Sequence, residues 1–227
     1  MTAAPVVRLL ALGDAAVLVV LGEAIDERVN ARVHRLAAEL RRLHAADPRF
    51  GAPVPAYASV LVPLDPIDPG LEAAIDVLSD VVAGTASGAP TVRDEAGALH
   101  ELPTRYGGVD GPDLAAVARL HDLRPAEVVE LHASVAYRAW FVGFAPGFAY
   151  LGPVPDQIAT PRLASPRARV PAGSVGLADE QTAVYPVASP GGWRLLGRTD
   201  VAIWRPAADR PALIEPGDRV RFVPQRH

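Results

Sequence analysis

Three arginines in one short segment are the strongest chemical signal in this sequence. Arg162, Arg167 and Arg169 fall within eight residues, and the surrounding segment 157–178 contains three prolines and no acidic side chain. A guanidinium on such a stiffened loop loses little entropy when it binds phosphate or carboxylate through paired hydrogen bonds. The pattern indicates either an anion site, which Arg198 would join if the C-terminal strands close into a barrel, or a solvated loop whose arginines pair with acids elsewhere.

Aromatic residues gather upstream of this segment, around a Pro-Gly turn. Phe144, Phe148 and Tyr150 lie within seven residues. Such a run either lines a ligand pocket, with the tyrosine hydroxyl as a polar handle, or forms ordinary packing in a barrel core. Gln181 and Thr182 add polar groups near a predicted strand end, where loops often carry function.

His132 lies near the end of a helix predicted over residues 126–134. An imidazole in that position either hydrogen-bonds the last helical carbonyls and complements the helix dipole, or serves as a general base. Both roles stay open on the sequence.

The composition of these 227 residues excludes several kinds of site. There is no Cys, and because all 22 Lys and Arg residues are Arg, disulfides, cysteine nucleophiles, Schiff bases and P-loop lysines are excluded. The six His are scattered without a carboxylate cluster, so we predict no metal site. A formal charge of −4, with no long apolar span and no signal-peptide pattern, predicts a cytoplasmic protein without nucleic-acid or membrane partners.

The first 90 residues show the alternation of a small α+β unit. Apolar runs at 6–12 and 16–21, separated by a Gly-Asp pair, predict a hairpin. Asp26 offers an N-cap to a helix whose apolar residues recur every three to four positions. A third strand at 57–64 and a second helix at 69–82 complete a β-β-α-β-α order, which fits a two-layer sandwich.

A run of small residues from Gly84 to Pro90 predicts a linker. We therefore divide the chain into an N-terminal α+β domain over 1–84, a linker over 85–90 and a second domain over 91–227. The second domain is expected to open with a strand at 99–106, followed by two helices that begin at Pro112-Asp113 and Arg124-Pro125. Short apolar runs separated by Pro and Gly then predict the strands of a barrel or sandwich, at 140–144, 174–177, 183–185, 193–196, 201–204 and 220–223.

The block from Phe141 to Thr199 resembles the family of 5-oxoprolinase B subunits and KipI proteins, also labelled allophanate hydrolase subunit 1. Weaker similarity extends over nearly the whole chain. The resemblance implies an α+β fold class, with a small N-terminal α/β sandwich domain followed by a cyclophilin-like β-barrel domain. The segments that carry it are Phe141–Leu151, Pro161-Arg162, Pro166-Arg167, Val170–Val175, Gln181-Thr182, Tyr185-Pro186 and Ser189–Thr199.

The same resemblance implies a biochemical role and partners. A protein of the C-subunit type is expected to form a heteromeric complex with this chain, and one of the A-subunit type to be needed for full activity. Such an assembly opens the small-molecule substrate 5-oxo-L-proline to L-glutamate with ATP, which Mg²⁺ accompanies, and the B and C subunits phosphorylate the lactam oxygen. The chain alone is expected to be inactive.

On this resemblance the arginine segment becomes the predicted catalytic element. Arg162, Arg167 and Arg169 would stabilise the transferred phosphoryl charge, and His132 would act as an acid/base. The predicted substrate-binding residues are Phe144, Phe148, Tyr150, Gln181, Thr182 and Arg198.

The sequence departs from the family pattern at two positions, and two other functions compete with the enzyme. Ala149 stands where the family usually has Pro, and Ala183 where it often has Gly. Because such changes near the predicted pocket could alter the substrate, the resemblance supports ATP-dependent amide chemistry more strongly than it supports 5-oxoproline as the substrate. The alternative is a KipI-like inhibitor of a sensor histidine kinase, which predicts an exposed apolar patch and no nucleotide affinity. Peptidyl-prolyl isomerase activity is suggested by the barrel alone.

Overall fold

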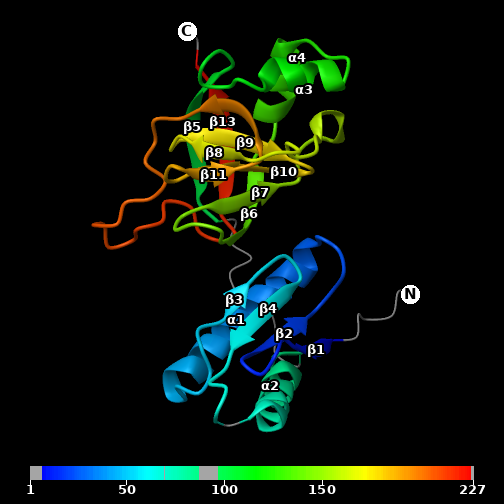
Figure 1. Ribbon diagram of the computed structural model, residues 1–227, viewed down its shortest axis with the longest axis vertical. Coiled ribbons are helices and arrows are strands. Elements are labelled where there is room, and N and C mark those ends of the chain that lie inside the picture. Colours follow the sequence, from blue (N-terminus) through cyan, green and yellow to red (C-terminus); the bar gives the residue numbers. More distant parts are fainter. Residues whose placement is uncertain (1–6, 69, 87–96, 226–227) are drawn as a thin grey trace. The chain divides into compact units, whose positions relative to one another are not determined.

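The structure is a computed structural model that describes residues 7–68, 70–86 and 97–225. The chain divides into two compact units, Met1–Asp94 and Glu95–His227, which can be followed by colour in Figure 1. Among the described helices, none combines the length and apolar character that a membrane crossing needs.

The N-terminal unit is a two-layer α/β sandwich. Its antiparallel sheet has the order β1-β2-β4-β3, and one face of the sheet shares a single apolar core with both helices. Alternation along the strands gives that face, because Val17 and Val19 of β2 and Val60 and Val62 of β4 are almost fully buried. The elements are β1 (Arg8–Ala11), β2 (Ala16–Val20), α1 (Glu27–Ala46), β3 (Val54–Pro55), β4 (Ser59–Pro63) and α2 (Leu71–Ala86).

Local signals in the sequence account for most of this unit. The carboxylate of Asp26 accepts hydrogen bonds from the Arg28 and Val29 amides, which confirms the predicted N-cap.

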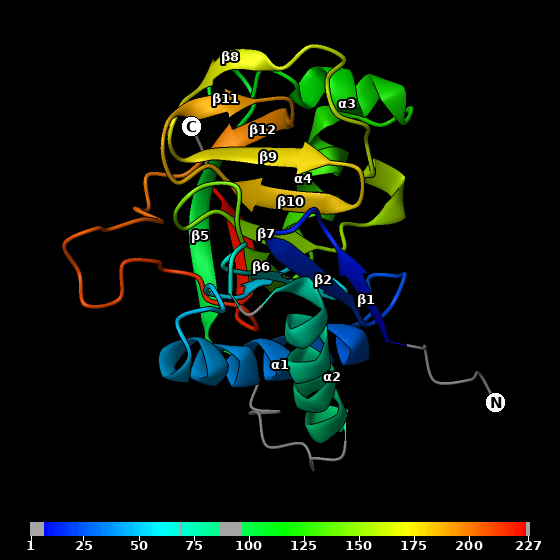
Figure 2. The same cartoon turned by 60° about the horizontal axis from the view of Figure 1, so that its bottom comes forward.

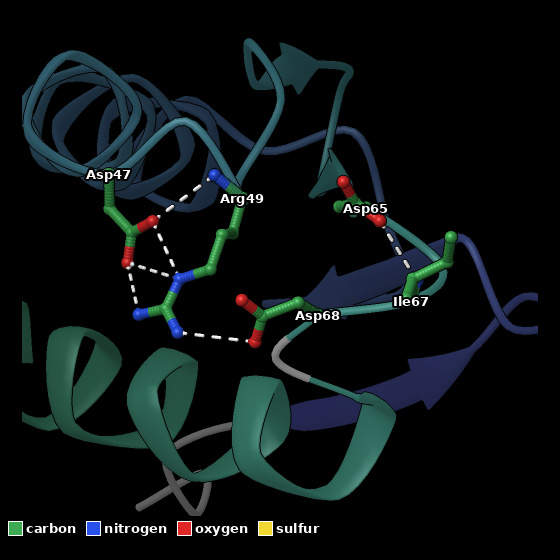
Figure 3. Close-up of polar contacts among 5 residues, drawn as sticks. All are labelled: Asp47, Arg49, Asp65, Ile67 and Asp68. Atoms are coloured by element: carbon green, nitrogen blue, oxygen red, sulfur yellow. Dashed lines mark hydrogen bonds and ion pairs between the residues drawn. The ribbon is translucent and has the colours of Figure 1, made fainter.

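Past the end of α1, the guanidinium of Arg49 binds both oxygens of Asp47 and one of Asp68, so it ties the loop after α1 to the segment before α2 (Figure 3).

Two features of this unit differ from the prediction. Helix α2 continues to Ala86, past the predicted end at 82, so Gly84 and the first two predicted linker positions are helical. A single Gly costs a helix only about 1 kcal/mol, and the hydroxyl of Thr85 donates to the Val81 carbonyl inside the same helix. Residues 87–90 of the predicted linker lie outside the described residues. The two-residue strand β3 was not predicted because it is too short for a periodic pattern.

The second unit contains a closed seven-stranded barrel in the order β10-β7-β6-β13-β5-β12-β9. A separate two-stranded sheet pairs β11 with β8, and Figure 2 shows β9 and β10 as neighbouring barrel strands. The strands are β5 (Leu99–Tyr106), β6 (Tyr137–Val142), β7 (Ala149–Gly152), β8 (Arg167–Val170), β9 (Ser174–Ala178), β10 (Gln181–Val184), β11 (Ser189–Gly191), β12 (Arg194–Arg198) and β13 (Arg219–Pro224).

All seven barrel strands contribute to one apolar core, which therefore fills the barrel interior. Helices α3 (Leu114–Leu120) and α4 (Pro125–Ala133) add Val117 and Val128 to this core, and a 3-10 turn (Asp156–Ile158) adds Ile158. The α+β class, with a small α/β sandwich followed by a β-barrel, is confirmed.

The predicted strand at 201–204 is wrong. Only an isolated bridge joins Trp204 to Ala212 there. The segment is apolar because Ile203 enters the barrel core from a loop, and burial alone produces the same short apolar run as a strand. Strands β8 and β11 were not predicted because their sequences, RARV and SPG, are not apolar runs, and β7 (AYLG) was missed because it closely follows a Pro-Gly turn.

Candidate functional site

A cluster of aromatic side chains lies on the outer face of the barrel. Side chains alternate along a strand, so Ala149 and Leu151 of β7 enter the interior while Phe148 and Tyr150 point outward. Phe148 is 2% exposed and makes edge contacts, with ring centroids 5.0 Å from Tyr150, 5.4 Å from Tyr185 and 5.5 Å from Trp193. We call Phe144, Phe148, Tyr150, Tyr185 and Trp193 the aromatic cluster.

Phe144 is the exposed member of the aromatic cluster. It is 63% exposed, and its ring meets Phe148 edge-on with centroids 5.2 Å apart. Its φ of 67° lies in the left-handed region, which a bulky side chain rarely adopts. The turn that holds it is closed by the Phe148 amide on the Ala145 carbonyl and the Gly143 amide on the Phe148 carbonyl. A strained, exposed aromatic contributes little to the core, and such positions concentrate at functional sites.

The strain at Phe144 predicts that glycine stabilises this position more than alanine does, the reverse of the usual order. Gly is ordinarily less stabilising than Ala, because it has more conformational freedom to lose on folding. At φ 67° the order reverses, and we expect Phe144→Gly to unfold with a free energy about 1 kcal/mol higher than Phe144→Ala. Urea unfolding of the two variants measures the difference. An alanine variant as stable as the glycine variant would contradict the left-handed conformation.

Arg162 lies within electrostatic range of this cluster. Burial raises the pKa of the Tyr150 hydroxyl, and the positive charge of Arg162 opposes that rise. Burial also raises the pKa of the Tyr185 hydroxyl, and the positive charges of Arg167 and Arg162 partly oppose this rise. Arg162 is exposed and makes no hydrogen bond or ion pair with the described residues. Its guanidinium is therefore available to a ligand beside the aromatic rings.

Both terminal nitrogens of Arg167 are hydrogen-bonded within the protein. One terminal nitrogen lies 2.7 and 2.8 Å from the two carboxylate oxygens of Asp113, and the other donates to the Trp193 carbonyl at 3.3 Å. Asp113 is 8% exposed and also accepts the Leu195 amide at 2.7 Å. This clamp joins the start of α3 to β8 and β12, so Arg167 positions the wall of the site.

Three other predicted polar residues are spread over the unit. Alternation places Gln181 on the outer face with Ala183, which packs into the aromatic cluster. Arg169 is exposed and makes no hydrogen bond or ion pair with the described residues. Arg198 lies at the other end of β12, where its Nε donates to the Ala172 carbonyl at 3.0 Å.

His132 and Thr182 belong to the barrel interior. His132 is fully buried and its Nε2 lies 2.9 Å from Thr182 Oγ1, which donates onward to the Gly176 carbonyl. Thr182 therefore accepts the Nε2 proton, and Nδ1 accepts the Tyr106 hydroxyl at 2.8 Å. Burial lowers the pKa of His132 to about 3, so the ring is neutral. Both ring nitrogens are therefore bonded to side chains of the barrel, Tyr106 and Thr182. Neither bonds to the last helical carbonyls, and neither is exposed to act as a general base.

The structure thus brings together Arg162, Arg167 and the predicted aromatic residues, with Gln181 on the same face. It leaves Arg198, His132 and Thr182 elsewhere, and Arg169 has no hydrogen bond or ion pair among the described residues. Sequence reasoning missed Trp193 and Asp113 as parts of the site. Trp193 follows a Gly-Gly pair that predicts only a turn, and Asp113 follows Pro112, which made it resemble an N-cap. Its carboxylate makes no capping hydrogen bond, because Arg167 and Leu195 take it.

A two-layer α/β unit followed by a closed barrel with an aromatic, cationic outer face defines a two-unit α+β protein. The family described as "Carboxyltransferase domain, subdomain C and D" matches residues 7–214. The relative from Bacillus subtilis (strain 168), which is the B subunit of 5-oxoprolinase, is 38% identical over 93% of this chain and 90% of its own length. The chain belongs to the family of 5-oxoprolinase B subunits.

Other similarities cover less of the related chains. The 5-oxoprolinase B subunit of Escherichia coli O157:H7 is 58% identical over 126 residues, which are 56% of this chain and 58% of that protein. The crystal structure of TTHA0988 in space group P6522 aligns with a TM-score of 0.77 and 36% identity, over 94% of this chain and 40% of its own. The chain therefore spans less than two thirds of both proteins.

Proposed function

We propose that this chain is the B subunit of an ATP-dependent 5-oxoprolinase complex and helps to phosphorylate the lactam of 5-oxo-L-proline. The observation that carries the proposal is the similarity to the Bacillus subtilis 5-oxoprolinase protein along nearly the full length of both chains. The free guanidinium of Arg162, within electrostatic range of Tyr150 and Tyr185, supports it, because the substrate and the transferred group are both anionic.

The proposed chemistry is phosphoryl transfer followed by hydrolysis. The lactam oxygen forms a bond to the γ-phosphorus of ATP as the bond to ADP breaks. Water then adds to the activated carbon, and the ring C–N bond opens as the amine takes a proton, which leaves an acyl phosphate. A second water hydrolyses this acyl phosphate to phosphate and L-glutamate. A partner of the C-subunit type shares the first step, and one of the A-subunit type the second.

The residues of the outer face have distinct parts in this proposal. Arg162 holds the transferred phosphoryl group, whose charge the transition state spreads over its equatorial oxygens. Phe144 and Tyr150 cover the ring of the substrate, and Gln181 orients its polar edge. Arg167 is a positioning residue through its clamp on Asp113.

Magnesium is proposed to enter with ATP. Among the described residues, no three His, Asp or Glu side chains are grouped as metal ligands. Mg²⁺ commonly keeps its water and binds through nucleotide phosphates and one or two carboxylates, so the fit does not require a site within this chain alone. Bound to ATP, it would neutralise phosphate charge, and this chain adds the guanidinium.

Arg162→Gln is expected to lower the 5-oxoproline-dependent ATPase activity of the assembled complex at least about tenfold, because it removes a charge-assisted contact to the transferred group. The measurement is ADP release by this chain co-purified with its partner of the C-subunit type, with and without 5-oxoproline. Arg119→Gln is the matched control, since Arg119 is equally exposed on α3, away from the aromatic cluster.

Two results would count against the proposal. Unchanged turnover in Arg162→Gln would remove that arginine from the site. A stable wild-type complex that neither binds ATP nor responds to 5-oxoproline would overturn the enzymatic function, and inhibition of a sensor histidine kinase would then be assayed.

A further inference from the structure

The N-terminal sheet carries a row of apolar side chains on the face opposite its helices. Core residues alternate along β2 and β4, so the positions between them point outward. Leu10 of β1, Leu18 of β2, Leu61 of β4 and Val54 of β3 lie directly opposite one another, and the row crosses all four strands, which can be followed in Figure 1. We call these four residues the outer row. Among the described residues, none of the four belongs to an apolar core.

The outer row is partly open to solvent and lies on an uncharged surface. Leu10 and Val54, on the two edge strands, are 43% and 50% exposed, and the two leucines between them are half-buried. An antiparallel sheet with one face in water ordinarily carries polar residues on that face. Here the two central strands have no charged side chain at their other outward positions, which are Ala16, Val20, Ser59 and Pro63.

Strand propensity does not account for these leucines. β-branched and aromatic residues are the ones enriched in strands, so Thr at an outward position would favour the strand and stay hydrated. Single exposed leucines are ordinary on protein surfaces. Four aligned apolar residues across a whole sheet form a contiguous patch instead, and such patches mark contact with another apolar surface.

The related proteins indicate that this other surface is a protein partner. The chain belongs to a family of B subunits, which act together with other subunits. In TTHA0988 the aligned region is only 40% of the chain, so there the same fold is one part of a larger polypeptide. Permanent interfaces of this kind are more apolar than transient ones, which matches an uncharged sheet face.

We propose that the outer row is the contact surface for the partner of the C-subunit type, which presents an apolar face to it. The one charged side chain at the adjoining outward position of β1, Arg8, is paired with Glu23 at 3.1 Å. The partner therefore has no charge to neutralise at this edge. The inference rests on the assembly in the proposed function and not on its chemistry.

The first test uses the absence of Cys from the sequence, because one introduced thiol can then be followed alone. Leu10→Cys and Val54→Cys place a thiol at either end of the outer row. Leu99→Cys is the matched control, since Leu99 is also 50% exposed on a strand, β5. Each variant is treated with a maleimide, alone and in the purified complex. Complex formation should slow labelling at least about tenfold at both row positions and less than about twofold at the control, because an interface core excludes water.

The second test measures affinity with substitutions that suit a strand. Leu10→Thr combined with Val54→Thr should weaken binding of the partner at least about tenfold by isothermal titration calorimetry, because it replaces apolar contacts with hydroxyl groups. Leu99→Thr should change the affinity less than about twofold. Both row positions are exposed and threonine favours strands, so the variant is expected to fold, which far-UV circular dichroism checks.

Other occupants of the outer row give different results, and each would overturn the proposal. Slow labelling of the free chain that depends on protein concentration would mean that a second copy covers the row. Slow labelling at every concentration would mean that another part of this chain covers it. Equal labelling in the free chain and the complex, or no complex at all, would exclude the partner from this face.

Failure of this inference and failure of the enzymatic function are distinguishable. Labelling and affinity are both measured without ATP or 5-oxoproline. A complex that protects the outer row but hydrolyses no ATP would support this interface and contradict the enzymatic function. An active complex that leaves the row open to labelling would do the reverse.

Discussion

Replacing Asp113 with alanine is expected to lower the free energy of unfolding of the barrel unit by about 3 kcal/mol. Removal of one partner from a buried ion pair typically costs about 3–5 kcal/mol, because the other charge is left uncompensated. The Arg167 side chain keeps 28% of its surface exposed, so water compensates part of the loss and places the effect at the lower end. The Leu195 amide also loses its acceptor.

Tryptophan fluorescence during urea unfolding measures this effect in the correct unit. The sequence has three tryptophans, Trp140, Trp193 and Trp204, and all belong to the second unit. Asp209→Ala is the matched control, because Asp209 is exposed and makes no ion pair within the described residues. A loss below about 1 kcal/mol in Asp113→Ala, the range of a solvent-exposed pair, would show that the clamp between α3, β8 and β12 is not formed.

The barrel unit is also expected to lose about 2 kcal/mol of stability through His132 alone between about pH 6.5 and pH 4.5. Burial lowers the pKa of His132 from 6.5 to about 3. Within that window His132 is protonated in the unfolded chain but not in the folded chain, so the free energy of unfolding falls as the pH falls. The free energy of unfolding changes by up to about 1.4 kcal/mol per pH unit. This dependence disappears below about pH 3, where the folded state is protonated as well.

The surroundings of His132 explain why the folded ring refuses the proton. Its hydrogen bonds are to Tyr106 and Thr182, and its ring packs against Tyr137 and Phe222 with centroids 5.3 and 4.6 Å away. Burial raises the pKa of both tyrosines, so their hydroxyls are neutral as well. None of these four contacts offers a negative charge to an imidazolium.

The difference between wild type and His132→Gln isolates this contribution. Glutamine can accept from Tyr106 and donate to Thr182 but does not titrate. We expect the variant to be less stable at neutral pH and its deficit to shrink as the pH falls, while acidic groups common to both chains cancel. Parallel curves for His132→Gln would contradict this prediction, because they would mean that the folded and unfolded states bind the His132 proton equally at each pH.

These two expectations bear on the proposed site in different ways. The Asp113 clamp sets where β8 lies, and with it the wall beside Arg162 and the aromatic cluster. The His132 chain fixes Thr182, the neighbour of Gln181 on β10. Both are supports, and loss of either should alter the site through the positions of other residues.

Elements with long, regular patterns could be located from the sequence alone. The Asp26 cap, the helix behind it and strand β5 over residues 99–106 lie where they were predicted. Their signals are local, because hydrophobic periodicity and capping are read within a few turns of the chain. The family resemblance rested likewise on a continuous block of residues.

The roles of the polar residues, in contrast, depend on contacts that form only when the chain has folded. Arg167 and Asp113 are 54 positions apart, and His132 and Thr182 are 50 apart. Long-range packing of the folded unit brings each pair together. It turns an expected catalytic arginine into a clamp and an expected acid/base histidine into a buried, neutral ring. Sequence spacing cannot show this, since a polar side chain is defined by its partner and its exposure to water, and long-range packing sets both.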